Sequence, residues 1–425
     1  MSASRKSMLP DFSTMSKDNP SIKSEVMNWL RTLKIPSESC RYRFSSSSDD
    51  TVFCTCFALF ILDLFKETEK FTEMEKQSWV SYIQSFQNEE FGYFEPEQYY
   101  HKDRERNRYQ LTCFCLSALG ILDAEPKFPL NFIRQWKTPD DIKKFLYERG
   151  CNEGKPGSGN KAMFLAIFLI YEYERTKENH LLEKINAWFE FHNETQNRNG
   201  FWGKDLKSHY LHGLQNGFHQ LVIYFYQQKE IPKLDRIIDI ALMSQDRRGF
   251  FAPTPGGEAC HDYDAVHILA MAFRITDYRR DDIQASLQKA LDAILSTCNS
   301  DGGFCQSKSK LSGLTDFLKY VPTYFSNLSP YLWYYRTRVS LGTVLQKKNE
   351  IYNGWIQKPI LWNESNLWDT WFRSLALAEK GRKKTVADYV KGQTRFKKIT
   401  EEQIRRLQEF TDKRWEEFVK RHGEG

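Results

Sequence analysis

The densest group of side chains able to do acid–base chemistry lies in residues 258–267, which read EACHDYDAVH. Asp264 and His267 are three positions apart, so on a helix they share a face and the imidazole can orient the carboxyl. A carboxyl in an apolar pocket can stay protonated at neutral pH and act as a general acid. Helix capping by Asp262 and a dipole role for Asp264 are the alternative. We predict Asp264, Asp262 and His261 as catalytic residues, and Tyr263 and His267 as substrate-binding residues.

A second polar group follows the spacing of one helix face within an otherwise apolar segment. Four polar residues recur at i, i+3, i+4 and i+7: His212, Gln215, Asn216 and His219. A buried helix with a polar stripe must turn that stripe toward polar partners or water. We predict His212 and His219 as catalytic acid–base residues, and Gln215 and Asn216 as substrate-binding residues. Water or hydrogen bonds between helices are the alternative.

Further substrate-binding candidates stand near the starts of expected buried helices. An inward Arg336 or Arg338 would make an anion site, although two residues only two positions apart cannot both face inward. Asp369 and Arg373 share a polar face four positions apart. Asp50 opens an apolar helix, where the sequence Ser-Ser-Asp-Asp would also make a good N-cap.

These side chains need elements to position them, and the pattern of apolar residues is helical nearly everywhere. We predict an all-α protein in which two kinds of helix alternate. Six are amphipathic, at 24–33, 74–86, 139–147, 181–191, 234–243 and 283–296. Six are apolar or aromatic nearly all round, at 51–65, 109–122, 161–173, 214–226, 265–275 and 331–345. A helix that is apolar on all sides is buried on all sides, so we expect two concentric rings.

The connections between these helices repeat as well, with a period near 50 residues that indicates a repeat architecture. Gly followed by an aromatic residue recurs between an outer and an inner helix, best in 244–250 (SQDRRGF) and 298–304 (CNSDGGF). This pattern resembles the prenyltransferase and squalene-cyclase type repeat. The resemblance implies an (α/α)6 toroid, a barrel of six helical hairpins with a C-terminal helical extension. We expect a draped N-terminal segment at 1–20, the toroid at 21–350, and C-terminal helices at 351–425 packed on it, ending in a charged helix at 400–422.

The same resemblance suggests a reaction. Asp262-Tyr263-Asp264-Ala265 is similar to the D-x-D-D acid motif of class II terpene cyclases, with Ala in place of the last Asp. The implied function is acid-initiated cyclisation of an isoprenoid in a central cavity, with Asp264 as the acid. Cys260, Asp262 and a histidine of another helix would resemble the zinc site of protein prenyltransferase β-subunits, but no Asp-x-Cys precedes them. We predict no metal and no cofactor.

Two other functions stay open at this stage. A carbohydrate-active lyase or hydrolase on an α/α toroid would also use paired carboxylates, His and Tyr. A non-catalytic toroid would hold an anionic ligand or a peptide. An aromatic and apolar cavity wall would favour the isoprenoid, whereas inward amides, Arg and carboxylates would favour the sugar.

Composition and charge indicate which kinds of partner and which compartment to expect. The net charge of +6 over 425 residues, without a clustered basic face, does not indicate nucleic-acid binding. The first twenty residues lack the apolar core of a signal peptide, and no stretch is apolar enough to span a bilayer. With nine Cys and no such signal, we expect a cytoplasmic protein with reduced thiols. We expect a small-molecule substrate, either isoprenoid or sugar, and leave open peripheral membrane contact and the oligomeric state.

Overall fold

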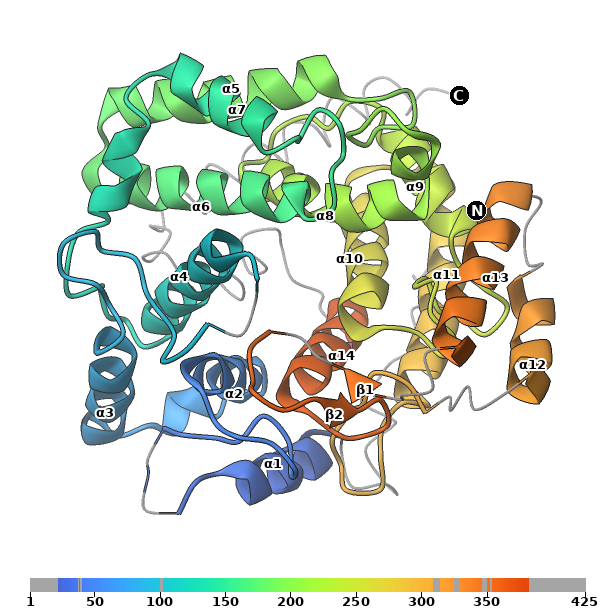
Figure 1. The fold of residues 1–425 in the computed structure, drawn as a ribbon, viewed down its shortest axis with the longest axis horizontal. Coiled ribbons are helices and arrows are strands. Elements are labelled where there is room, and N and C mark those ends of the chain that lie inside the picture. Colours follow the sequence, from blue (N-terminus) through green and yellow to red (C-terminus); the bar gives the residue numbers. More distant parts are fainter. Residues whose placement is uncertain are drawn as a thin grey trace, which may run out of the picture.

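The computed structural model describes residues 22–36, 38, 40–99, 102–308, 314–324, 329–345, 350–351 and 354–381. Figure 1 shows these residues as helices arranged around a centre, with very little strand. The segment expected at 1–20 and the helix expected at 400–422 lie outside the described residues. No helix within the described ranges has both the length and the apolar character needed to cross a membrane.

Six of the described helices form a closed inner ring. Each of them packs against the next, and the last packs against the first. They are α2 (Val52–Leu64), α4 (Arg104–Ile121), α6 (Ser158–Thr176), α8 (Leu211–Tyr226), α10 (Ala259–Ile275) and α14 (Leu367–Gly381). Nearly every residue of α2 from Val52 to Ile61 is buried, as a helix covered on all sides requires. The predicted (α/α)6 arrangement is therefore confirmed.

The amphipathic helices lie outside this ring and cover it. They are α1 (Ile22–Leu33), α3 (Glu73–Gln84), α5 (Pro139–Glu148), α7 (Asn179–Thr195), α9 (Leu234–Met243) and α11 (Arg280–Leu295). Local sequence fixes where some of them begin. Thr72 and Glu75 form a capping box at α3, and Thr138 and Asp141 do so at α5, which satisfies backbone N–H groups that the helix itself leaves unpaired. Three short 3-10 helices complete the repeats, at η2 (Thr68–Lys70), η3 (Asn131–Gln135) and η4 (Leu206–His209).

A repeated glutamine ties three of the hairpins to the next one. In each case the side-chain amide donates to the carbonyl of the turn glycine and to a second carbonyl about 40 residues further along the chain, on the way to or within the following outer helix. The three sets are Gln87 with Gly92 and Phe128, Gln196 with Gly200 and Pro232, and Gln245 with Gly249 and Ser286. One side chain thus fixes both the turn and the spacing between neighbouring repeats.

The last turn closes the outer ring onto its beginning. Gly302 has a φ of +92°, and a Cβ at this position would lie 2.4 Å from the backbone oxygen of Glu25 in α1. A Cβ at the neighbouring Gly303 would lie 2.5 Å from the indole ring of Trp29, also on α1. Residues almost 280 positions apart therefore touch, which an open solenoid would not allow.

The sixth inner helix is not the one expected. The segment expected at 331–345 forms α13 (Pro330–Leu345), which pairs with α12 (Leu314–Tyr324) outside the ring. The ring is closed instead by α14, which contacts both α10 and α2 although it lies beyond residue 350. Between α13 and α14 the chain makes a short antiparallel pair, β1 (Glu350–Ile351) and β2 (Ile360–Leu361). The assignment failed because α13 and α14 are both rich in aromatic residues. The pair α12 and α13 lies in the chain between the last outer helix, α11, and the last inner helix, α14.

Candidate functional site

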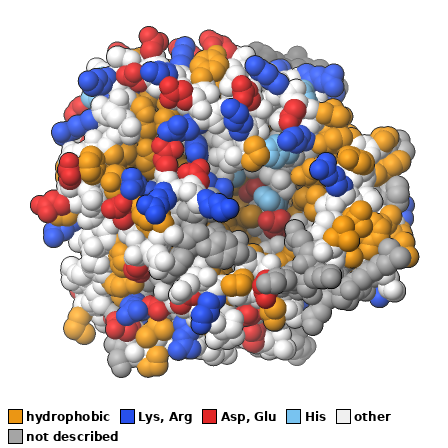
Figure 2. All heavy atoms as spheres, in the orientation of Figure 1, with side chains coloured by type: hydrophobic (Ala, Val, Ile, Leu, Met, Phe, Trp, Pro, Cys, Tyr) orange, Lys and Arg blue, Asp and Glu red, His pale blue; other side chains and the backbone are white. Residues whose placement is uncertain are grey.

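The inner helices carry a stripe of half-buried side chains although outer helices cover their backs. On α8 the stripe is His212, Gln215, His219 and Val222, and on α6 it includes Asn160, Met163 and Ile167. Solvent reaches these positions from within the ring. Figure 2 shows a hollow near the middle of the molecule in which His and acidic side chains gather. The stripe is polar near the helix N-termini and becomes apolar further along each helix.

Contacts join the beginning of α6 to the first half of α8 at the polar end of the hollow, which we call the mouth. Asn160 of α6 and His219 of α8 are joined through Nδ2 and Nε2 at 2.6 Å. His212 donates to the Gly154 carbonyl at 3.1 Å, and Asn216 accepts from the Gly159 backbone N–H at 2.8 Å. Asn216 thereby caps α6, whose own N-cap residue is a glycine without a side chain.

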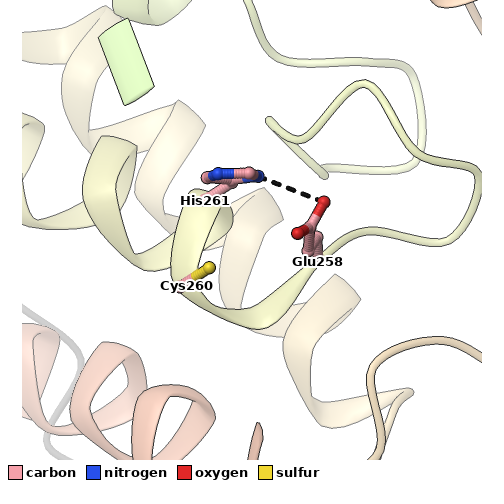
Figure 3. Close-up of side chains that lie close together, drawn as sticks. All are labelled: Glu258, Cys260 and His261. Atoms are coloured by element: carbon pink, nitrogen blue, oxygen red, sulfur yellow. Dashed lines mark ion pairs between the residues drawn. The ribbon is translucent and has the colours of Figure 1, made fainter. Parts of the chain in front are cut away.

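The first turn of α10 places three chemically different groups side by side. Glu258, Cys260 and His261 each offer one ligand-type atom, and these atoms lie within 4.8 Å of one another. Figure 3 shows the Glu258 carboxylate facing the His261 ring, with the Cys260 sulfur on the same turn. The Glu258 Oε2 to His261 Nδ1 distance is 3.1 Å. The zinc set considered from the sequence, with Asp262, is not formed, because the Asp262 carboxylate turns toward Arg373.

Charge and burial set the protonation of this turn. Burial opposes the charge on His261, but the Glu258 carboxylate and the nearby Asp264 outweigh it and raise the pKa of His261 to about 9. Burial likewise opposes ionisation of Glu258, yet the His261 contact leaves the pKa of that carboxyl lowered. The two side chains therefore form a charged pair at neutral pH. Burial and neighbouring carboxyls raise the pKa of the Cys260 thiol, which keeps its proton.

Zinc takes thiolate, imidazole and carboxylate ligands, so the Glu258–Cys260–His261 set fits it by donor type. A zinc ion there would displace the Cys260 proton and compete with the Glu258–His261 pair. The absence of a metal requirement stays a prediction.

Asp264 lies one turn deeper on α10 and differs from its neighbours. Its side chain is almost completely buried, and among the described residues no side chain or backbone group donates a hydrogen bond to it. Burial raises its pKa well above the usual value, with Glu258 and Asp262 adding to the effect and His261 opposing it. Burial in this setting favours the protonated form of the carboxyl, which can donate a proton.

Asp262, only two positions away, has a different environment. Its Oδ1 accepts from the backbone N–H groups of Phe251 and Ala252 at 2.8 and 2.9 Å. Its Oδ2 accepts from the Glu258 N–H at 2.9 Å and from Arg373 Nη1 at 2.7 Å. All of its acceptor positions are used, so Asp262 holds the turn before α10 and links α10 to α14 rather than offering a group to a ligand.

Asp369, on the first turn of α14, is a second carboxyl with unusual acidity. It is buried, and its Oδ2 accepts from Asn366 Nδ2 at 2.5 Å. Burial raises its pKa to about 7, against the opposing effects of Asn366 and Arg373. The negative charge of Glu258 also acts on Asp369, which places the α14 carboxyl on the same side of the mouth as the α10 turn.

An aromatic wall borders this acidic corner. Trp368, Trp371 and Phe372 of α14 and Phe114 of α4 are half-buried, which places them on the hollow, whereas the adjoining rings of α2 are buried. Trp371 lies 4.8 Å from Phe60 and 5.9 Å from Phe114, measured between ring centroids. Phe372 lies 5.3 Å from Tyr263 of α10. The wall therefore runs without interruption from α4 through α2 and α14 to α10.

The two α8 histidines are uncharged at neutral pH. Burial lowers the pKa of His219 to about 4, and the positive charge of Arg106 adds to this. Both ring nitrogens of His219 are already used, one by the Gln215 carbonyl and one by Asn160. Burial also lowers the pKa of His212. By contrast, the Gln215 side-chain nitrogen is buried and has no hydrogen-bond partner in the described part of the chain.

Several predicted residues lie away from the hollow. Tyr263 and His267 are fully buried and stack on each other within the wall, with ring centroids 5.7 Å apart. Arg336 is buried outside the ring, where it donates to the carbonyls of Ser244, Phe251 and Ala252. Arg338 is exposed on α13. Asp50 pairs with Arg41 at 2.7 Å in the loop before α2.

Sequence reasoning did not select Arg106, Glu258 and Cys260 as site residues. Helix α4 begins at Arg104, about one turn earlier than expected. Its first turn therefore contains Arg106, which the expected start at residue 109 left outside the helix. No carboxylate among the described residues forms an ion pair with Arg106, and burial lowers its pKa. The signal that could have revealed it is Asp103, whose side chain caps α4.

The architecture and the site together define a toroid of six helical hairpins with an acid–base mouth over an aromatic wall. A family model described as the prenyltransferase alpha-alpha toroid domain matches residues 7–104 and 95–312, which is more than half of the chain. The protein therefore belongs to this family, as the glycine–aromatic repeat predicted. Neither the curated proteins nor the solved structures that were searched include a match to the chain.

Proposed function

We propose that this protein is an enzyme that starts a reaction on an isoprenoid by protonating it, with Asp264 as the acid. The observation that carries the proposal is the state of this carboxyl. It is buried, its pKa is raised well above the usual value, no described group donates a hydrogen bond to it, and it interacts electrostatically with His261 and Glu258. Membership of the prenyltransferase toroid family supports an enzyme of the prenyltransferase or cyclase kind.

The proposed step is a proton transfer to a carbon–carbon double bond. The Asp264 O–H bond breaks, a C–H bond forms, and the positive charge moves to the neighbouring carbon of the substrate. The faces of Trp368, Trp371 and Phe372 then stabilise that carbocation through their π-electrons while the chain cyclises. Loss of a proton from the product restores a double bond.

The role of His261 follows from its charge. Once Asp264 has given up its proton, a carboxylate remains in an apolar setting, which is costly unless a cation is nearby. His261 is protonated at neutral pH and interacts with Asp264 electrostatically. We assign it the stabilisation of the Asp264 carboxylate and, through its exposed edge, the return of a proton from solvent. Glu258 keeps His261 charged.

The test is turnover of candidate substrates by Asp264→Asn beside the parent protein. Squalene-like hydrocarbons and prenyl diphosphates would be incubated with each protein, and cyclic products identified by mass spectrometry. Asp235→Asn is the matched control, because the same change is made at an exposed position on the outer helix α9. We expect Asp235→Asn to keep the activity and Asp264→Asn to lose a factor of about 100 to 10,000, the usual contribution of a general acid. Retained activity in Asp264→Asn would contradict the proposal that Asp264 is the acid.

A carbohydrate lyase or hydrolase is the second candidate, and the polar mouth favours it. Gln215 has an unpartnered amide nitrogen, and Arg106 has no ion-pair partner among the described residues. Such groups commonly bind hydroxyls and carboxylates of a sugar. The same screen, run with neutral and acidic oligosaccharides, separates the two candidates, since a hydrocarbon chain would make no use of these groups.

A further inference from the structure

Arg106 is a cation within the ring to which the fold gives no counter-charge. It lies in the first turn of α4, where its side chain is half-buried. Throughout the described ranges, no carboxylate lies within ion-pair distance of its guanidinium, and burial lowers its pKa. A partly desolvated charge without a partner is costly, and in a hollow it indicates a site for a ligand of opposite charge.

The guanidinium of Arg106 lies near three other inner helices. Its Nη1 lies 3.5 Å from the position that a Cβ on Gly157, the N-cap residue of α6, would take. Its positive charge acts on His219 of α8, and it is within electrostatic range of Cys260 of α10. Arg106 therefore lies at the mouth, beside the N-terminus of α6, and a helix N-terminus also favours negative charge.

An unused hydrogen-bond donor lies on the neighbouring face of α8. The side-chain nitrogen of Gln215 is buried and finds no hydrogen-bond partner among the residues that the structure describes. Gln215 stands between His212 and His219 on the polar stripe, and its carbonyl contacts Nδ1 of His219 at 3.0 Å. A buried amide without its hydrogen bond is destabilising, and a ligand with an acceptor atom would offset that cost.

The charge available at the mouth selects the kind of anion. Two other cations at the starts of inner helices are already paired, Lys161 with Asp103 at 2.8 Å and His261 with Glu258 at 3.1 Å. Arg106 thus supplies an unpaired positive charge. A single guanidinium matches a carboxylate, to which it can donate two parallel hydrogen bonds. A diphosphate carries more negative charge than one guanidinium balances.

Beyond this polar end, the hollow becomes apolar along each helix. The half-buried side chains of α6 change from Asn160 to Ile167, and those of α4 change from Arg106 to Phe114. Phe114 contacts Trp371 of the aromatic wall, with ring centroids 5.9 Å apart. The helix rise between the polar and the apolar positions is about 10–12 Å. The hollow therefore suits a molecule with a charged head and an apolar tail of about that length.

We propose that the substrate is an apolar acid, whose carboxylate binds Arg106 and the Gln215 amide and whose hydrocarbon tail lies along the aromatic wall. This substrate class rests on the proposed function, since it names what Asp264 would protonate. Isoprenoid carboxylic acids therefore join the candidate substrates. A neutral hydrocarbon leaves the polar mouth without a partner, and a sugar leaves the apolar depth without one.

The experiment is isothermal titration calorimetry of the full chain with three probes that share one isoprenoid tail: geranic acid, geraniol and geranyl diphosphate. The test variant is Arg106→Gln, and Arg104→Gln is the matched control, because Arg104 is exposed in the same turn of α4. We expect the parent and the control to bind geranic acid at least about tenfold more tightly than geraniol. Arg106→Gln should bind geranic acid about 10- to 100-fold more weakly, with its affinity for geraniol unchanged.

A second variant tests the same head site without touching the charge. Gln215→Leu removes the amide and should weaken the binding of geranic acid by about fivefold, again without changing that of geraniol. Thermal unfolding of each variant shows whether it folds. If Arg106→Gln does not fold, the Gln215→Leu result decides, and an unchanged affinity for geranic acid would contradict the proposal.

Three further results would overturn it: equal affinity of the parent for geranic acid and geraniol, tighter binding of geranyl diphosphate than of geranic acid, or an equal loss of affinity in Arg104→Gln. A uronic-acid oligosaccharide that binds more tightly than geranic acid, and loses its affinity in Arg106→Gln, would assign the site to a sugar instead.

Asp264→Asn separates this proposal from the proposed function, because it should bind geranic acid as tightly as the parent. Binding of geranic acid without turnover of any isoprenoid would support the head site and contradict the role of Asp264. Cyclic products that depend on Asp264, from a protein that does not prefer geranic acid to geraniol, would mean the reverse.

Discussion

The carboxylate of Asp262 on α10 lies 2.7 Å from Nη1 of Arg373 on α14, and both side chains are almost completely buried. Arg373 also donates to the Gln306 carbonyl at 2.9 Å. This ion pair joins two inner helices whose residues are 111 positions apart, at the place where the ring closes. It therefore fixes the position of α14 relative to the first turn of α10.

Breaking this pair from one side should cost more than removing it. In Arg373→Met the Asp262 charge stays buried without its partner, which we expect to cost about 3–5 kcal/mol of unfolding free energy. The double variant Asp262→Asn and Arg373→Met removes both charges and should be clearly more stable than the sum of the single variants predicts. Denaturant unfolding of the four proteins measures this coupling. Additive losses would mean that the two side chains act independently.

The closing turn offers a test of the ring itself. Gly302→Ala places a Cβ against the Glu25 backbone at a φ of +92°, and we expect a loss of about 2 kcal/mol or more from the strain and the forced shift. Gly342→Ala on α13 is the control, since a Cβ there meets nothing within 4 Å. Ala favours a helix over Gly, so the control should gain up to about 1 kcal/mol. If both variants melt at the same temperature, the contact between the last turn and α1 has no energetic weight.

The acidity of Asp369 predicts a dependence of stability on pH. Its pKa is about 7 in the folded protein and about 3.9 in an unfolded chain. The folded state therefore binds more protons, and stability from this group is complete below about pH 4 and is lost as the pH rises through 7. Asp369→Asn cannot ionise, so its melting temperature should fall less than that of the parent between pH 4 and 8. Asp235→Asn, at an exposed position on α9, should follow the parent.

The protonated Cys260 thiol leads to a prediction about metal. Because the Glu258–His261 pair is complete without an ion, we expect a chelator to leave the melting temperature unchanged. Added zinc should raise it little, and Cys260→Ser should respond in the same way as the parent. A large zinc-dependent rise that Cys260→Ser abolishes would assign a metal to this turn instead.

Much of the fold could be predicted from local pattern. Helices that are apolar on every side must be buried, and amphipathic helices between them must cover them, so the alternation along the chain already implied two rings. The glycine–aromatic turns marked the connections between the outer and the inner helices. The residues 258–267 stood out as an acid–base group for the same local reason, since carboxyl, thiol and imidazole groups occur there within three turns of one helix.

The division of roles within that group was decided by neighbours distant in the sequence. Asp262 and Asp264 have the same side chain and lie two positions apart, yet Arg373 and the backbone of Phe251 satisfy Asp262, whereas burial raises the pKa of Asp264.

The sequence by itself determined the repeat and the alternation of buried and covering helices, because both follow from the periodicity of apolar side chains. Only the tertiary structure decided that α14 rather than α13 completes the ring, and which carboxyl of α10 forms the buried ion pair with Arg373. Both depend on contacts across the ring, and such contacts leave no periodic trace in the chain.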